Sequence, residues 1–298
     1  LRLGIILLGL RLSLQDVVAT GLSALLLIVA CMAVALTLAF FAGRLLKIPP
    51  RLAALIGVGT AICGNTAIVA VAPVIEAKEE EVSFAVATIT FFGTLAVVVY
   101  PLIGYFLGVS DRTFGLWAGT AVNDTSQVVA AGAAFSDKAR DIATVVKLTR
   151  NTLMVPVMIL IGLVYARSQR RSSHVPGTSR PEGGVPGTSS RVTFGKIVPW
   201  FVLGFLLMTL LRTAGVALGI LPQDVAHPGA LTAAASALKF VDEVARFAVL
   251  MALSAIGLGT DVEAVRRTGV KPFALGLSLA SMLAVFSLGT ILVMGMGR

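Results

Sequence analysis

The sequence predicts an all-α fold: a polytopic membrane helix bundle with inverted repeats and discontinuous helices. Of its 298 residues, 57% are hydrophobic and only 13% are charged, which is more apolar surface than one soluble core can bury. The apolar runs are close to twenty residues long, far longer than the alternating segments of a membrane β-barrel. Short similarities recur along the chain, and polar residues interrupt two of the runs.

Nearly uncharged runs mark the expected membrane spans. After a partial helix at 1–10, we expect spans at 17–43, 51–76, 81–108, 112–136, 140–166, 197–220, 230–258 and 271–297. The first full span has 27 residues without a charge and would be about 40 Å long, so it should be tilted in the bilayer. Because Leu1 is not an initiator residue and the partial helix is too short to cross the hydrocarbon, we expect N-terminal residues to precede this sequence.

The segment 167–196 differs from the rest in composition. It carries six basic residues against one acid, Glu182, and repeats Val-Pro-Gly-Thr-Ser, so we expect a disordered linker between two parts of one membrane domain, 1–166 and 197–298. A cytoplasmic linker also satisfies the positive-inside rule, because alternation of the spans then places thirteen basic loop residues inside and five outside. On this basis, loops 44–51 and 109–112 are expected inside and loop 76–81 outside.

Several function classes are excluded by charge and motif content. The net charge of +9 does not indicate nucleic-acid binding, because the basic residues lie in short loops between apolar runs. Cys31 and Cys63 lie within those runs and predict neither a disulfide framework nor a metal site. No nucleophile–base motif, phosphate loop or metal-ligand cluster appears in the sequence. We therefore expect no cofactor, no metal and no enzymatic activity.

Two internal similarities bear on the repeat. Residues 9–21 match 257–269 at a constant offset of 248, with the first copy outside and the second inside, which is typical of an inverted repeat. Residues 59–62 (Gly-Thr-Ala-Ile) match 119–122 (Gly-Thr-Ala-Val) at an offset of 60. If both segments belong to membrane spans, they point the same way and are parallel elements. The alternative is that one of them re-enters the membrane without crossing it, and the sequence does not distinguish the two cases.

Polar residues interrupt the runs 51–76 and 112–136 near their middle. The first break reads Cys-Gly-Asn-Thr at 63–66, and the second reads Asn-Asp-Thr-Ser-Gln at 123–127. Glycine frees the backbone, and a lone carboxylate such as Asp124 costs at least about 3 kcal/mol at the bilayer centre. The sequence therefore predicts two discontinuous helices whose breaks approach each other and offer backbone N–H and C=O groups to a ligand. A kink satisfied by neighbouring helices is the structural alternative.

Lys147, Arg150 and Asn151 share one face of the run 140–166, since they lie three and four residues apart. Counted from Ala139, Arg150 lies about 16 Å into its helix, near the bilayer centre. An ion pair with Asp124 would neutralise at most one of the two cations. A spare cation that faces the N-terminal ends of half-helices suits an anionic substrate.

Five segments also carry a resemblance to a known family. They read LGIILLGLRLSLQDV, GVGTAICGNTAIVAVAPVI, GTAVNDTSQVVAAG, VVKLTRNTLMVPV and AIGLGTDV. In this order they resemble the bacterial YeiH-like family of sulfate exporters (UPF0324, conserved hypothetical 698), over nearly the whole chain apart from 167–196. The resemblance implies an inner-membrane bundle of ten or eleven helices and a sulfate or sulfonate substrate. The long basic linker and Arg212, where a neutral polar residue is expected, depart from the family's pattern.

We therefore expect a secondary transporter of the bacterial inner (plasma) membrane that exports a small anion, sulfate or a sulfonate, by alternating access. The expected substrate-binding shell comprises Asn65, Thr66, Asn123, Thr125, Ser126, Gln127, Lys147, Arg150 and Asn151. Asp124 is expected to be the coupling or gating carboxylate, with H⁺ or Na⁺ as coupling ion. Two alternatives stay open: a cation/proton antiporter that binds its ion at Asp124, and a non-transporting membrane scaffold or sensor that works through the linker. A homodimer is also left open.

Overall fold

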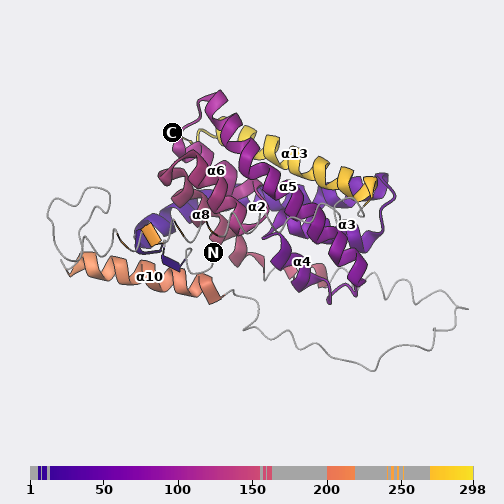
Figure 1. Ribbon diagram of the computed structural model, residues 1–298, viewed down its shortest axis with the longest axis horizontal. Helices are drawn as coiled ribbons and strands as arrows, with labels where there is room; N and C mark the ends of the chain where they lie inside the picture. The colour runs from indigo at the N-terminus through magenta and orange to yellow at the C-terminus, as the bar shows by residue number, and fades with distance from the viewer. Residues whose placement is uncertain are drawn as a thin grey trace, which may run out of the picture.

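Figure 1 shows the computed structural model, which describes residues 6–7, 9–11, 14–154, 157–158, 160–162, 200–218, 240, 243–244, 247, 251 and 269–297. Over these residues the chain is all-α, without a strand. The elements in chain order are η1 Gly9–Arg11, α2 Leu14–Leu45, α3 Pro50–Ala61, α4 Asn65–Val71, α5 Glu79–Leu107, α6 Asp111–Ala121, α7 Thr125–Phe135, α8 Asp137–Thr152, α10 Trp200–Ala217 and α13 Val270–Val293. The linker 167–196 and nearly all of 230–258 and 257–269 lie outside the described residues, so the linker and the longer-range repeat stay predictions.

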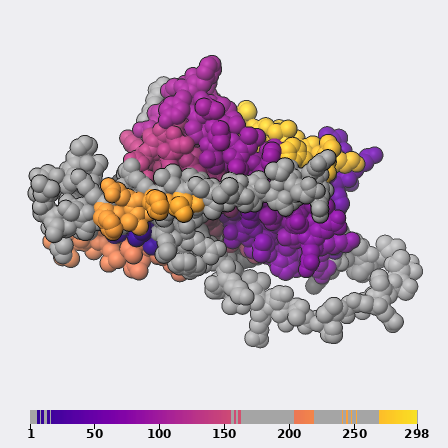
Figure 2. Space-filling view, viewed as in Figure 1, coloured from indigo at the N-terminus to yellow at the C-terminus, as the bar shows by residue number. Residues whose placement is uncertain are grey.

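Three of the described helices are long and apolar enough to cross a membrane. They comprise Val17–Leu45, Glu79–Leu107 and Val270–Val293. Large apolar side chains stay exposed along them, for example Phe106 at 90% and Val285 at 74%, and Figure 2 shows α13 lying open on the surface of the molecule. Such continuous apolar surface is stable in lipid. The chain is a polytopic helical membrane protein, and the predicted spans 17–43, 81–108 and 271–297 are confirmed.

Helices α3 and α4 form a hairpin rather than one straight span. Arg51 in the first turn of α3 lies 3.8 Å from Glu76, beyond the end of α4, measured from Nη2 to Oε2. A straight helix between these residues would separate them by about 37 Å. Ile68 of α4 also packs against Gly59 of α3, where an added Cβ would meet its Cδ1 at 2.9 Å. The chain therefore enters the bundle, reverses at 62–64 and returns to the end at which it entered.

Helices α6 and α7 form a second hairpin of the same kind. The rings of Phe114 and Phe135 stack with their centroids 4.1 Å apart, although a straight helix would separate the two residues by about 31 Å. The Ser136 hydroxyl donates to Asp111 Oδ1 at 2.7 Å, which joins the two ends of the hairpin. Helix α5 has 29 residues and a length of about 43 Å, and it connects the two hairpins. They therefore enter from opposite ends of the bundle.

The segments α2–α4 and α5–α7 are two copies of one arrangement in opposite orientations: a long helix followed by a hairpin. Pro50 and Asp111 begin α3 and α6, and Asn65 and Thr125 begin α4 and α7, so corresponding helices begin about sixty residues apart. The matching segments 59–62 and 119–122 fall at the C-terminal ends of α3 and α6. These ends point in opposite directions, which makes the shorter-range similarity an inverted repeat.

The prediction that the runs 51–76 and 112–136 span the membrane was wrong, because both re-enter. The sequence had left open the re-entry of one of them. The predicted sides of two loops are wrong for the same reason. Loop 76–81 lies at the same end as loop 44–51, and residues 111–112 lie at the other end with 136–138. A hydropathy profile treats each apolar run as one membrane span and cannot distinguish a span from a re-entrant hairpin.

Helix α8 packs against the second hairpin, α6 and α7, and its basic side chains reach the first. Gly119 of α6 faces Val146 of α8, where an added Cβ would meet the valine Cβ at 2.7 Å, and Gly132 of α7 lies equally close to Arg140. Helix α13 packs along α5, with Gly276 against Phe92 (Figure 1). Because glycines line these contacts, the helix backbones approach closely, as is typical of membrane bundles. Such packing places the middle of α8 beside the two hairpin tips.

Labelling of single cysteines tests the two hairpins. In a background without Cys31 and Cys63, Lys47→Cys and Lys78→Cys should react with an impermeant maleimide from the same side of the membrane. Arg112→Cys and Lys138→Cys should both react from the other side. Two straight spans would instead put position 78 opposite 47, and 112 opposite 138.

Positions 47 and 138 serve as references for the two sides of the membrane, because they lie on opposite sides in both topologies. The side chains at 47, 78, 112 and 138 are all exposed. Labelling of 78 together with 138, or of 112 together with 47, would rule out the corresponding hairpin.

Candidate functional site

The two hairpin tips meet inside the bundle. Residues 62–64 separate α3 from α4, and residues 122–124 separate α6 from α7. Gly64 has a φ of 66°, in the left-handed region that glycine adopts without steric cost, and this conformation turns the chain. A Cβ on Gly64 would lie 3.3 Å from Cα of Asp124 and 3.2 Å from its Oδ2. The two predicted breaks, and their approach to each other, are confirmed.

Lys147 of α8 binds the tips of both hairpins. Its Nζ donates to the carbonyl of Ile62 at 2.9 Å, to that of Val122 at 3.0 Å and to that of Asn123. An ammonium group has three N–H donors, so the backbone takes all of them. The side chain is 0% exposed. Lys147 therefore acts as a buried cross-link between the two hairpins.

Arg150, one turn further along α8, makes a second set of bonds of the same type. Its Nε donates to the carbonyl of Ala61 at 2.6 Å, and Nη1 donates to that of Thr120 at 2.8 Å and, more weakly, to that of Val122 at 3.4 Å. Its Nη2 donates to the carbonyl of Thr60. These carbonyls belong to the last turns of α3 and α6, where they lack partners within their helices.

The position of the two cations corrects one expectation. Lys147 and Arg150 lie at the C-terminal, electronegative ends of half-helices, not at N-terminal ends. These positions satisfy the carbonyl groups that the helix breaks leave free. In lipid no water can donate to such carbonyls, so donors from a neighbouring helix take the place of water. A positive charge at a helix C-terminus is also favoured by the helix dipole.

Asp124 forms no ion pair with either cation in the described part of the chain, so the structural alternative of such a pair is not found. Its Oδ1 accepts the backbone N–H of Ser126 at 2.9 Å and the Ser126 hydroxyl at 2.6 Å. Its own N–H donates to Gln127 Oε1 at 3.2 Å. Asp124 is therefore the N-cap of α7, in a capping box with Gln127. Local capping satisfies the carboxylate, while backbone carbonyls satisfy the cations.

Helix α5 connects both hairpin tips through two threonines that the sequence analysis did not single out. Asn65 Nδ2 donates to the Thr90 hydroxyl at 3.0 Å. Gln127 Nε2 donates to the Thr90 carbonyl at 3.1 Å and to the Thr94 hydroxyl at 3.3 Å. Two threonines four residues apart share one face of an otherwise apolar helix, and that spacing was the available signal. Asn65 and Gln127 therefore hold the hairpins in position.

The remaining predicted residues surround the first turn of α7. Asn151 Nδ2 donates to the Thr125 hydroxyl at 3.3 Å, and Thr125 and Ser126 are buried. Thr66 is exposed and Asp124 is partly exposed. The amide oxygens of Asn123 and Asn151 are buried without a hydrogen-bond partner in the described structure. Buried acceptors without a donor are rare in folded proteins, so these two oxygens suit a group that carries N–H or O–H, which a bare oxyanion lacks.

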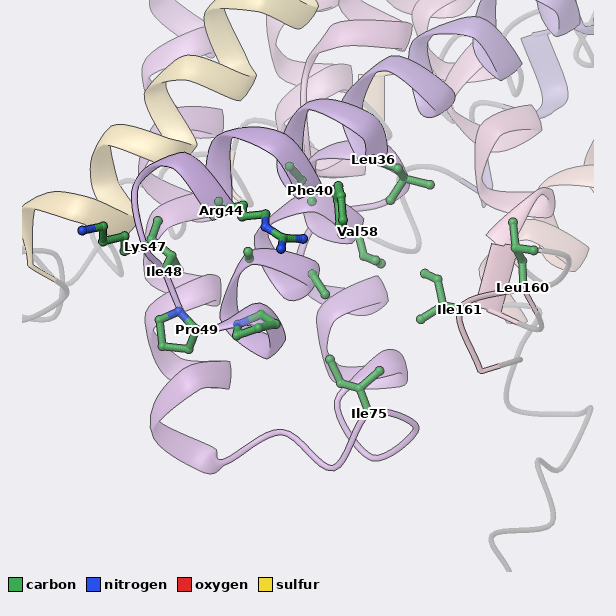
Figure 3. Close-up of a pocket in the computed structure, with 16 residues that line it drawn as sticks. Leu36, Phe40, Arg44, Lys47, Ile48, Pro49, Val58, Ile75, Leu160 and Ile161 are labelled. Carbon is green, nitrogen blue, oxygen red and sulfur yellow. The ribbon is translucent and has the colours of Figure 1, made fainter. Parts of the chain in front are cut away.

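A cavity of about 940 Å³ lies apart from this cluster, between α2, α3 and residues 160–161 (Figure 3). Its walls are mostly apolar, and Arg44 and Lys47 are the basic residues among those that line it. Figure 3 shows Arg44 extending between Phe40 and Val58, while Lys47 points away. None of the predicted site residues lines this cavity, so the candidate site is the cluster at the hairpin tips.

Arg150→Gln tests the cross-link. This variant removes most donors to carbonyls that lipid cannot solvate, so we expect the free energy of unfolding to fall by about 3 kcal/mol or more. The measurement is the melting temperature of the purified protein in detergent. Lys138→Gln, an exposed change on the same helix, is the control and should stay within about 0.5 kcal/mol. A variant at position 150 that melts like the wild type would contradict the structural role.

Known proteins similar to this chain are named as membrane proteins. The family model described as conserved hypothetical protein 698 matches residues 1–276. A UPF0324 membrane protein of Clostridium tetani is 34% identical over 96% of this chain and 78% of its own length. Others, from Fusobacterium nucleatum and Streptococcus agalactiae, are 32% and 34% identical over 99% of this chain and 82% and 80% of their own lengths. No solved structure matches. The chain belongs to the conserved hypothetical protein 698 family of UPF0324 membrane proteins.

Proposed function

We propose that this protein is a secondary transporter, not an enzyme, and that it exports a small anion of the sulfate or sulfonate class by alternating access. One observation carries the proposal: two hairpins that enter from opposite ends meet tip to tip inside the bundle. Inverted repeats with discontinuous helices and a site at mid-membrane are typical of secondary transporters. A hairpin on each side of the site also gives each side a separate element that can open.

The charges at the tips favour an anion over a cation. Lys147 and Arg150 contribute two positive charges and Asp124 one negative charge. The C-terminal ends of α3 and α6 add about one negative charge between them, and the N-terminal end of α7 adds about half a positive charge. The sum stays positive, at about +0.5. Because lipid and protein screen charge weakly, this excess attracts an anion to the tips.

The hydrogen-bonding groups around the first turn of α7 suit an oxyanion. The Thr125 hydroxyl accepts from Asn151 and keeps its own hydrogen as a donor, and the Ser126 hydroxyl, which donates to Asp124, can exchange that partner for a ligand. Sulfate and sulfonate oxygens accept such donors, and a helix N-terminus adds favourable potential. Lys147 and Arg150, whose donors go largely to carbonyls, act on the substrate through their electric field. Thr66 is the group of α4 that is open to a ligand.

A cation/proton antiporter is the second candidate, and the position of Asp124 favours it. Both hydrogen bonds that the carboxylate accepts go to Oδ1, while Oδ2 faces Gly64 and the side chain is partly exposed. A carboxylate with one open oxygen suits H⁺ or Na⁺. In this alternative Asp124 binds the transported ion, and the positive field of Lys147 competes with it.

Flux through proteoliposomes separates the classes. We expect radiolabelled sulfate, or a sulfonate such as taurine or cysteate, to exchange across vesicles that contain the protein and not across empty vesicles. A cation/proton antiporter would instead change the internal pH when a Na⁺ or K⁺ gradient is applied. A scaffold or sensor would move none of these solutes, and that result would refute the transporter proposal.

Asp124→Asn distinguishes the two transport mechanisms in a folded protein, because asparagine is an equally good N-cap. For anion transport, we expect binding of labelled sulfate or sulfonate to be unchanged or up to about tenfold tighter, since a negative charge is removed and tenfold is 1.4 kcal/mol. Coupling to H⁺ or Na⁺ should be lost. For cation antiport, ion binding should disappear. Asp111→Asn, at the far end of the same hairpin, is the matched control and should change neither.

A further inference from the structure

Backbone carbonyl groups form a cage around the Lys147 ammonium group, and no carboxylate of the described residues accepts a hydrogen bond from it, although Asp124 lies close enough to interact electrostatically. The three oxygens of the cage come from Ile62 in one tip and from Val122 and Asn123 in the other. Glycine at position 64 lets the tips approach to van der Waals distance. The ammonium nitrogen at 0% exposure is therefore coordinated by backbone oxygen alone, at the meeting point of two interrupted helices.

Such an arrangement has the chemistry of a monovalent-cation site. Unwound carbonyls and C-terminal ends of half-helices coordinate Na⁺ in transporters with discontinuous helices. A potassium ion and an ammonium group have similar sizes, and the same carbonyl oxygens can coordinate the ion or accept hydrogen bonds from the ammonium group. In this protein, the ion in the cage is a side chain that is covalently attached to α8.

We propose that Lys147 is a tethered cation that occupies a monovalent-cation site between the hairpin tips, so that the tips assemble without Na⁺ or K⁺. Shortening the side chain opens this site to a free ammonium or alkali ion. The inference concerns the assembly of the tips and holds whether or not the protein transports an anion.

Arg150 allows the site to be tested in an assembled protein. It binds the carbonyls of Thr60, Ala61 and Thr120 and shares only Val122 with Lys147. Without the lysine side chain, Arg150 still joins the ends of α3 and α6, and the three cage oxygens still face the vacated space. Lys147→Ala removes three carbons and the ammonium group, so propylammonium replaces the missing atoms one for one.

The experiment measures melting temperatures of purified protein in detergent with choline, Na⁺, K⁺ or propylammonium as the chloride salt. We expect the wild type to melt equally in all four. Lys147→Ala should melt lower in choline, and propylammonium should restore at least about 4 °C in a saturable manner, with a smaller recovery in K⁺. If Lys147→Ala can be purified only with propylammonium present, that requirement is the same rescue.

Two control variants make the result specific. Lys147→Met fills the space without a charge and should melt low in every salt. Lys138→Ala, exposed on the same helix, should melt like the wild type and respond to none of the cations. The proposal is overturned if Lys147→Ala gains nothing from any of the cations, if it cannot be obtained even with propylammonium, or if the wild type requires Na⁺ or K⁺ for its stability.

Discussion

The structure depends on the satisfaction of backbone carbonyls at two helix breaks. An interrupted helix frees the C=O groups of its last turn, and in lipid each unsatisfied group costs several kcal/mol. Lys147 and Arg150 donate to six such carbonyls from the two hairpins. The cost of burying two cations is offset because each is bonded to oxygens at the electronegative ends of helices. Neither the breaks nor the cations would be stable without the other.

The hairpin geometry explains why one helix serves both breaks. Helices α3 and α6 have 12 and 11 residues, which correspond to depths of about 16–18 Å, near half of the hydrocarbon thickness of about 30 Å. Two such half-helices that enter from opposite ends must reach the same depth. Their C-terminal carbonyls then lie at one level of the bundle, within reach of two residues that are three positions apart on α8.

Local features of the site could be predicted from the sequence, whereas its long-range contacts could not. Gly64 and Asp124 marked the breaks, and the spacing of Lys147 and Arg150 placed both cations on one face at the right depth. The reversal at each break left no trace in hydropathy, because a mostly apolar run such as 51–76 fits one tilted span or two half-helices equally well. The sequence offered Asp124 as a partner for at most one of the cations. A hydrogen bond to a backbone carbonyl cannot be predicted from residue types, because every residue has a backbone carbonyl group.

The same contacts divide the tips into a fixed part and an adaptable part. The C-terminal ends of α3 and α6 are held by cations that donate nearly all of their N–H groups, so they change little without breaking several bonds at once. The first turn of α7 is held by separate bonds of several side chains: Ser126 donates to Asp124, Gln127 donates to α5, and Asn151 donates to Thr125. Unpaired amide oxygens lie beside it. A ligand can exchange partners on this side at low cost. Ligand binding at the tips would therefore shift α7 and its capping residue Asp124, while the hydrogen bonds of Lys147 and Arg150 keep the ends of α3 and α6 in place.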